Sequence, residues 1–256
     1  KNRKSNRRME GGIIMTEYTY QWNPEWEEDP SMPQLKVTKS SLNTFEFCRK
    51  QYEFNYIEGR KQEPNMAMIK GTIVHNSYED FYNQFEIKKA EELDQNNVYD
   101  YCMGLFPIDD YGDIYQTMAA FETERFIQSR SEEMLDTFLP AGNEIRCNAK
   151  LVIPKDCNPK FILQRDYTVH LQGIIDRVFQ EGNGFVPVEL KTGVWKDRKR
   201  TNMRNEMAFY KVLMEADPDC ELDPVTHWAW YFPDSNYFEL EEIKTQGKTQ
   251  VLTAEA

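Results

Sequence analysis

Apolar residues recur at helical spacing in the first half of the chain and alternate with polar residues in much of the second half. The helical pattern covers residues 41–57, 70–85 and 114–138, with Ser41 as the expected N-cap of the first segment. Residues 90–113 contain Gly, Pro and many Asp residues, which favour a loop with short helical pieces. The first half is therefore predicted to be mainly helical.

The second half is predicted to contain strands interrupted by one helix. Residues 144–153 alternate between polar and apolar side chains, as in a half-exposed strand. Apolar segments flank the turn sequence at 181–184 and form a predicted hairpin, and a second hairpin is expected between residues 226 and 243. The helix predicted over residues 202–216 carries a stripe made of Met203, Met207, Tyr210 and Met214. This order of elements is typical of an α+β or mixed α/β fold.

The chain of 256 residues is long enough for one large domain or two small ones. Residues 16–37 are rich in Trp, Pro and acidic side chains, so we expect residues 1–37 to form an irregular or partly disordered arm. The remainder, residues 38–256, contains no internal repeat and no long low-complexity tract. We therefore expect a single folded domain over residues 38–256.

Five cysteines are scattered along the chain and never form a C-x-x-C pair. An odd number without that spacing fits reduced thiols in an intracellular protein better than a disulfide framework. No run of 18 or more apolar residues and no secretory signal pattern is present. These features predict a cytoplasmic protein without a membrane-spanning segment.

The net charge of −12 argues against a general affinity for nucleic acids. A basic segment, called the basic strip below, nonetheless follows Lys191, and Asp197 is its only acidic residue. The strip consists of Lys196, Arg198, Lys199, Arg200 and Arg204. It is either a solvated loop or a binding surface for a phosphate backbone, and charge alone does not separate the two.

Three charged side chains lie in the first predicted hairpin: Asp176, Glu189 and Lys191. A two-residue turn at Gly182 and Asn183 would place Asp176 opposite Glu189, with Cα atoms about 4.5–5.5 Å apart. Side chains alternate faces along a strand, so Glu189 and Lys191 share a face. Two adjacent carboxylates repel unless a cation lies between them, and such oxygen ligands suit Mg²⁺ or Mn²⁺. The alternative is a charged cluster on a solvated sheet face.

Five short motifs occur in order between residues 40 and 214: SSLNTFEFCRKQYEF, GTIVH, GIIDRV, VELKTG and EMAFY. None is specific alone, because E-x-K triplets are common by chance. Together, with thirteen positions from Asp176 to Glu189, they resemble the RecB-like branch of the PD-(D/E)XK nucleases, which includes CRISPR-associated RecB-type and phage exonucleases. The resemblance implies a restriction-endonuclease-like core, with a central mixed sheet, flanking helices, a helical N-terminal part and a helical insertion at about 76–140.

The resemblance also implies roles for individual residues. The implied metal ligands are His75, Asp176, Glu189 and the backbone carbonyl of Leu190. The implied catalytic residues are Asp176, Glu189 and Lys191, and the implied substrate-facing helix residues are Glu206 and Tyr210. Simpler interpretations stay open for two of them. His75 is otherwise an ordinary helix-surface or core histidine, and Tyr210 is otherwise a core residue, because it lies on the methionine stripe.

The sequence departs from the family pattern at two places. Glu206 stands where the family has Gln, and a carboxylate cannot donate a hydrogen bond as an amide does. Many relatives hold an iron–sulfur cluster with one early and three late cysteines. Here Cys48 matches the early position, but only Cys220 follows the helix motif. Because a conventional cluster needs four thiolates, we expect none, and we expect Cys48 to be a small buried residue.

The resemblance implies a metal-dependent DNA nuclease, with an exonuclease on single strands or DNA ends favoured, in recombination, repair or phage DNA processing. The basic strip would bind the phosphate backbone, and Tyr52, Tyr56, Tyr78 and Tyr82 are candidates to stack on unpaired bases. No helicase P-loop is present, so a helicase or recombination protein would be a separate partner. The alternatives are a structure-specific endonuclease, a catalytically silent DNA-binding or scaffolding homologue, and a metal-free acidic interaction protein.

Overall fold

A computed structural model describes residues 34–60, 63–156 and 166–243. Within these ranges, six strands form one mixed sheet: β1 (Gln34–Thr38), β2 (Gly142–Ile153), β3 (Tyr167–Glu181), β4 (Gly184–Leu190), β5 (His227–Phe232) and β6 (Tyr237–Glu242). The strand order is β1-β3-β4-β5-β6, and β2 also pairs with β3. The pairs β1 with β3 and β4 with β5 are parallel, and the other pairs are antiparallel. The mixed α/β fold is thereby confirmed.

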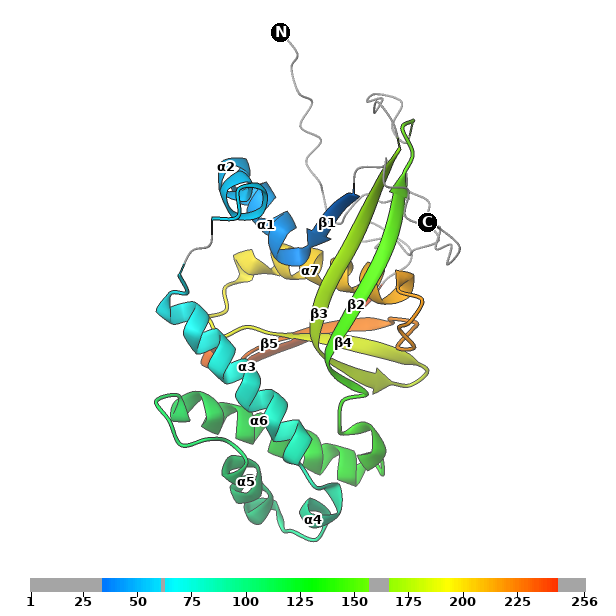
Figure 1. The fold of residues 1–256 in the computed structure, drawn as a ribbon. Coiled ribbons are helices and arrows are strands. Elements are labelled where there is room, and N and C mark those ends of the chain that lie inside the picture. Colours follow the sequence, from blue (N-terminus) through cyan, green and yellow to red (C-terminus); the bar gives the residue numbers. More distant parts are fainter. Residues whose placement is uncertain (1–33, 61–62, 157–165, 244–256) are drawn as a thin grey trace.

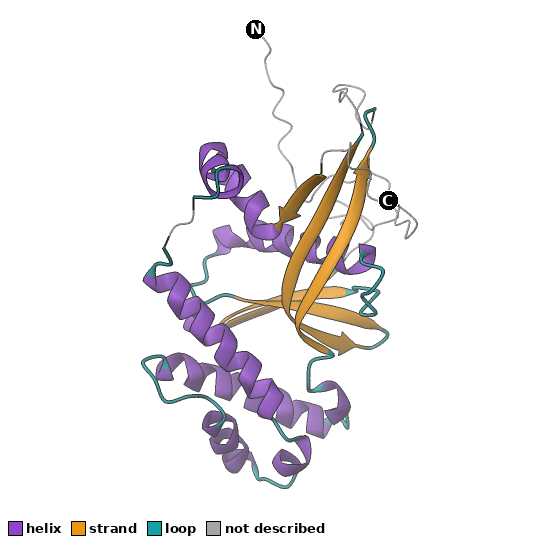
Figure 2. Ribbon diagram, viewed as in Figure 1, coloured by secondary structure: helices purple, strands orange, loops and turns teal. Residues whose placement is uncertain are grey.

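Helices cover both faces of this sheet (Figures 1 and 2). The α-helices are α1 (Lys39–Phe47), α2 (Arg49–Tyr52), α3 (Met66–Gln84), α4 (Ile87–Glu91), α5 (Gln95–Gly104), α6 (Gly112–Ser131) and α7 (Arg200–Ala216). Shorter turns are η1 (Glu53–Ile57, π-helical) and the 3₁₀ turns η2 (Leu135–Thr137), η3 (Asp197–Lys199) and η4 (Pro233–Ser235). Helix α7 packs its methionine stripe on one face of the sheet, whereas α3, α5 and α6 build a second core on the other.

The hairpin between β3 and β4 has the predicted geometry. Glu181 pairs with Gly184 across a two-residue turn, in which Gly182 has a φ of +57° that favours glycine. Arg177 pairs with Val188, which is the predicted register. Asp176 and Glu189 are the next residues of the two strands, so the turn chemistry alone brings the two carboxylates together.

Two helix starts differ from the prediction because other side chains cap them. Helix α1 begins at Lys39, and its N-cap is Thr38, whose hydroxyl accepts from the Ser41 amide at 3.1 Å. Ser41 is the reciprocal member of this capping box and not the N-cap. Helix α3 begins at Met66, capped by the Asn65 side chain, which is four residues before the predicted start at residue 70.

Strand β1 was not predicted, because its residues lie in the segment that we interpreted as irregular. It exists through parallel pairing with β3, where Gln34 meets Thr168 and Thr38 meets Gln172. Residues 1–33 lie outside the described part of the chain, so the division into an arm and a single domain stays a prediction. Over the described ranges, no helix is both long and apolar enough to cross a membrane.

Candidate active site

The two hairpin carboxylates lie in the protein interior and not on a solvated sheet face. Asp176 is 9% exposed and Glu189 is 2% exposed. The Leu190 amide donates a hydrogen bond to Asp176 Oδ2 at 2.8 Å, which fixes that carboxylate against the end of β4. Burying two adjacent carboxylates is unfavourable without compensating cations. The solvated-surface interpretation is therefore wrong, and the site needs positive charge.

Helix α3 brings His75 to the same place. Its Nδ1 atom lies 3.5 Å from Asp176 Oδ1, and its Nε2 atom lies 3.1 Å from the Leu190 carbonyl oxygen. His75 is thus neither a plain core residue nor a solvated surface residue, because its ring lies between the Asp176 carboxylate and the Leu190 carbonyl. The imidazole, the Asp176 carboxylate and the Leu190 carbonyl form one group of possible metal ligands.

Glu144 on β2 is a further possible metal ligand in this group, and the sequence did not predict it. Ligand atoms of His75, Glu144 and Asp176 all lie within 4.8 Å of one another. The neighbours of Glu144 pair with β3, but Glu144 itself does not, and its φ is +51°, which is rare for a residue other than glycine. The alternating pattern of the strand gave no signal, because it makes Glu144 one of several outward polar residues.

Two lysines compensate the charge of Glu189. Lys191 Nζ lies 2.5 Å from Glu189 Oε1 and 3.0 Å from Glu206 Oε2. Lys39, the first residue of α1, lies 2.5 Å from the same Glu189 oxygen and 2.5 Å from the Tyr210 hydroxyl. Lys39 carried no signal in the sequence analysis, because only the pairing of β1 with β3 places it here. Tyr210 is 2% exposed, so it belongs to the core while its hydroxyl reaches the site.

The pKa values of the two buried hairpin acids, Asp176 and Glu189, are shifted in opposite directions. Burial opposes ionisation of Glu189, but Lys191 and Lys39 outweigh it and hold the pKa of that carboxyl well below its usual range. Burial raises the pKa of Asp176, and the Glu189 charge raises it further. Burial and Asp176 likewise raise the pKa of Glu144. Glu189 is therefore ionised, whereas nearby cations do not fully balance a negative charge on Asp176 or Glu144.

These residues fit a hard divalent cation. The donor set consists of carboxylate oxygens, an imidazole and a carbonyl, which are ligands that Mg²⁺ and Mn²⁺ accept. The second oxygen of Glu189, Oε2, is buried without a hydrogen-bond partner among the described residues. A buried anionic oxygen in that position is costly unless a cation contacts it. A cleft of about 820 Å³ opens over the group, and its walls include Lys39, His75, Asp176, Glu189 and Lys191.

The order of these residues along the chain agrees with a known family. The family profile of the PD-(D/E)XK nuclease superfamily matches residues 36–255. The chain belongs to the PD-(D/E)XK nuclease superfamily. No curated protein matches the sequence closely enough to add a relative. Within the matched range, Glu189 and Leu190 end β4, Lys191 follows them, and Asp176 lies thirteen positions earlier on β3.

In this member of the superfamily, the basic strip divides into two parts. Arg200 pairs with Glu239. Arg204 makes a bidentate pair with Glu241, and the N–O distances of that pair are 2.5 to 3.1 Å. Lys196 and Arg198 are exposed and form no ion pair within the described ranges. Lys199 Nζ donates to the Val194 carbonyl at 2.7 Å. Contact of Arg200 or Arg204 with a phosphate would require exchange of an existing carboxylate partner.

Two of the four tyrosines considered for base stacking are excluded by their position. Tyr78 and Tyr82 are 2% and 6% exposed, and both hydroxyls donate to the buried Glu122 carboxylate. Their rings are therefore part of the hydrophobic core that α3, α5 and α6 form on the sheet. Tyr52 and Tyr56 stack on each other with ring centroids 5.1 Å apart on the N-terminal helices, and Tyr56 is 45% exposed. Cys48, expected to be buried, is half-buried at the end of α1.

Replacing Asp176 by asparagine is expected to stabilise the metal-free protein. The raised pKa means that the folded state disfavours the Asp176 anion, so stability is lost as pH rises through that pKa. Asp176→Asn should therefore raise the melting temperature in EDTA at pH 7.5 by roughly 2–4 °C for each kcal/mol gained. The gain should shrink as the pH falls below the ordinary Asp pKa of 3.8, because the carboxyl then becomes protonated in the unfolded state as well.

Thermal unfolding in EDTA at several pH values measures this effect. Asp197→Asn is the matched control, because its carboxylate is 92% exposed and its removal should leave the melting temperature unchanged. A lower melting temperature for Asp176→Asn at pH 7.5 would show that Asp176 is well compensated without a metal.

Proposed function

We propose that this nuclease is a Mg²⁺- or Mn²⁺-dependent deoxyribonuclease, and that His75, Asp176, Glu189 and the Leu190 carbonyl hold the cation. The observation that carries the proposal is the buried hairpin pair, Asp176 at 9% and Glu189 at 2% exposure, facing a large cleft with an orphaned Glu189 oxygen. Structural carboxylates of this kind are normally hydrogen-bonded or paired throughout. An incompletely satisfied acidic pair beside a cleft is typical of a metal-dependent active site.

The chain's own residues supply the remaining chemistry. His75, Asp176, Glu189 and the Leu190 carbonyl would hold a divalent cation, which would supply positive charge to the reaction and lower the pKa of a bound water. The Lys191 ammonium, whose pKa Glu189 and Glu206 raise against the effect of burial, stays protonated and stabilises the negative charge that develops at phosphorus. Lys39 donates to Glu189 Oε1 and to the Tyr210 hydroxyl, and it thereby orients Glu189. Tyr210 and Glu206 on α7 border the substrate path.

The finer assignment is to the RecB-like branch and to exonuclease action on single strands or DNA ends. It is supported by the histidine on α3, the hairpin acids and the Tyr210 helix, which follow one another in the order of that branch. Lys196 and Arg198 are the basic-strip residues whose charges are available to a phosphate backbone. An intracellular role in recombination, repair or phage DNA processing, beside a separate helicase or recombination protein, follows from the same resemblance.

The decisive assay uses end-labelled linear single strands, linear duplexes and covalently closed circles, each with Mn²⁺ or with EDTA. We expect linear DNA to be degraded only with Mn²⁺ and closed circles to stay intact. Cleavage of circles would contradict the exonuclease assignment and leave the nuclease in place. Absence of cleavage on every substrate, by a folded preparation that binds Mn²⁺, would contradict the enzymatic function and favour a silent homologue.

Glu144→Gln is expected to weaken Mn²⁺ binding without unfolding the protein. Glu144 offers a carboxylate within 4.8 Å of the His75 and Asp176 ligand atoms, and the amide keeps its shape but loses its charge. We expect the Mn²⁺ affinity, measured by calorimetry, to fall by about tenfold or more. Glu79→Gln is the matched control, because Glu79 acts on Glu144 only through its charge and lies outside the ligand group. Equal affinities for the two variants would remove Glu144 from the site.

A further inference from the structure

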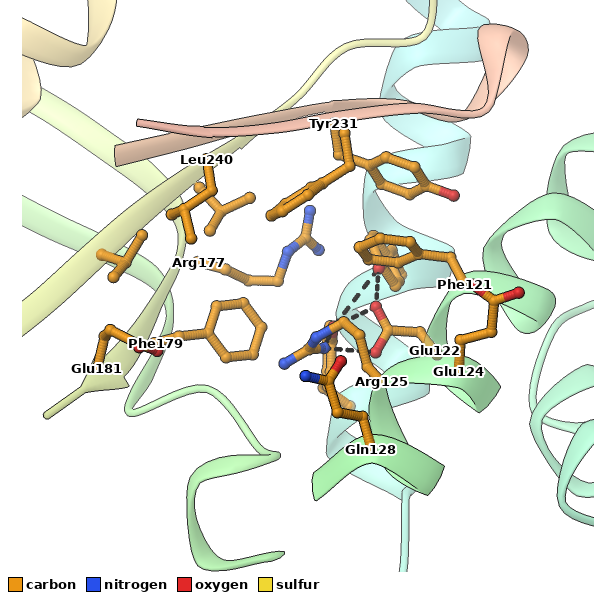
Figure 3. A pocket seen from close by; sticks show the side chains of 15 residues that line it. Phe121, Glu122, Glu124, Arg125, Gln128, Arg177, Phe179, Glu181, Tyr231 and Leu240 are labelled. Carbon is orange, nitrogen blue, oxygen red and sulfur yellow. Dashed lines mark hydrogen bonds and ion pairs between the residues drawn. The ribbon is translucent and has the colours of Figure 1, made fainter. Parts of the chain in front are cut away.

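A second cavity lies on the opposite face of the sheet, between β3 to β6 and the helices α3 and α6 (Figure 3). Its volume of about 380 Å³ suits a small organic molecule. Aromatic and aliphatic side chains form most of its wall, among them Phe121, Phe179, Tyr231, Phe238 and Leu240. None of the residues discussed above as possible metal ligands lines this cavity, so it is distinct from the candidate active site.

The cavity contains a buried guanidinium that lacks an acceptor. Arg177 is 2% exposed, and its Nη2 atom has no hydrogen-bond partner among the described residues. The guanidinium lies over the Tyr78 ring, 4.0 Å from the ring centroid, which covers its flat face. Figure 3 shows its side chain reaching toward the middle of the group of lining residues. Contact with a ring does not satisfy an in-plane N–H group, so the buried Nη2 atom still needs an acceptor.

The protein supplies no anion to Arg177 within ion-pair distance in the described ranges. The nearby buried acid, Glu122, is 0% exposed and already accepts from Arg125 at 2.5 Å and from Tyr82 at 2.6 Å. Tyr78 donates to the same carboxylate. Glu122 and Arg125 therefore pair with each other. The other two acids of the lining, Glu124 and Glu181, are exposed and form no ion pair with Arg177 within the described ranges. An acceptor from outside would satisfy the buried Nη2 atom.

The geometry favours a carboxylate as that acceptor. A planar guanidinium matches a carboxylate through two parallel hydrogen bonds. A phosphate dianion would carry a second negative charge into walls of Phe, Leu and Val side chains, with no second unpaired cation to meet it. The aromatic walls in turn suit the apolar body of such a ligand.

We propose that this cavity binds a small organic carboxylate, with its carboxylate on Arg177 and its apolar or aromatic body against Phe121, Phe179 and Leu240. This cavity and the candidate active site lie on opposite faces of the sheet and share strand β3. Arg177 directly follows Asp176 on β3, and Tyr78 lies one helical turn after His75 on α3. The proposal does not depend on nuclease activity, and its test measures binding alone.

The test uses benzoate, 3-phenylpropionate and hexanoate, each compared with its neutral amide, and inorganic phosphate as a further probe. Binding to the full chain is measured by saturation-transfer NMR and calorimetry. We expect at least one acid to bind at least about tenfold more tightly than its amide, because only the acid pairs with the guanidinium. Phosphate should not bind at this site. Arg177→Met should abolish the preference for the acid.

A second variant keeps the test valid if Arg177→Met fails to fold. Leu240 is 48% exposed at the cavity, so Leu240→Trp should fill the cavity, leave the fold intact and block binding of the acid. Ile108→Trp is the matched control, because Ile108 is fully exposed and lies outside the cavity, and it should bind as the wild type does. Equal binding of acids and amides, binding of no acid, or unchanged binding in Leu240→Trp would overturn the proposal.

Discussion

Lys191→Ala is expected to lower the single-turnover rate of DNA cleavage by about 10²–10³-fold or more, as for loss of one transition-state charge donor. The variant should fold, because Lys39 still contacts Glu189 Oε1 at 2.5 Å and keeps the buried carboxylate paired. Its Mn²⁺ affinity should stay close to that of the wild type, since Lys191 is not a ligand. Rates at saturating Mn²⁺ and a calorimetric titration measure the two quantities separately.

Lys39→Ala is the natural comparison, because Lys39 contacts the same carboxylate oxygen from α1. It should slow cleavage much less than Lys191→Ala, since its role is to orient Glu189 and Tyr210. If Lys39→Ala were the more damaging of the two, the roles of the lysines would be reversed. Cleavage by Lys191→Ala at the wild-type rate would remove Lys191 from the mechanism.

Glu189→Gln is expected to abolish both Mn²⁺ binding and cleavage. Glu189 is the hairpin acid that the lysines keep ionised, and its Oε2 atom, buried without a hydrogen-bond partner among the described residues, is the strongest indication of a cation site. An amide removes that charge and leaves Glu206, 3.0 Å from Lys191 and 3.6 Å from Lys39, as the carboxylate that both lysines still contact, so some loss of stability is also expected. Calorimetry with Mn²⁺ and the cleavage assay measure the effect.

Glu206→Gln is the matched control for this variant. Glu206 contacts Lys191 at 3.0 Å and lies outside the ligand group, so its replacement should leave Mn²⁺ affinity near the wild-type value. It also restores the residue type that the family carries at this position. Wild-type Mn²⁺ affinity in Glu189→Gln would show that the cation binds elsewhere, for example through His75, Glu144 and Asp176 alone.

The sequence predicted what short-range chemistry determines. The turn at Gly182 and Asn183 sets the hairpin register, and the register places Asp176 beside Glu189. The alternation of residues 144–153 likewise produced strand β2, with Cys147, Ala149 and Leu151 buried. The place of His75 came from the family resemblance, since one histidine on a helix has no distinguishing periodicity.

What the sequence could not predict depends on contacts between distant segments. Strand β1 exists only because it pairs with β3, and that pairing brings Lys39 to Glu189. Glu144 reaches the site because one residue of β2 leaves the regular ladder, which no pattern of polar and apolar residues records. The basic strip is a local run of charge, yet Arg200 and Arg204 pair with Glu239 and Glu241 on the distant strand β6.

The most direct test of the account is an anomalous-scattering map from crystals of the protein grown or soaked with Mn²⁺. We expect one strong peak within about 2.5 Å of oxygen atoms of both Asp176 and Glu189 and of a His75 ring nitrogen. In that state Glu189 Oε2 would have the partner that it lacks here. A map without a peak at this position, at Mn²⁺ concentrations that support cleavage, would contradict the proposed site.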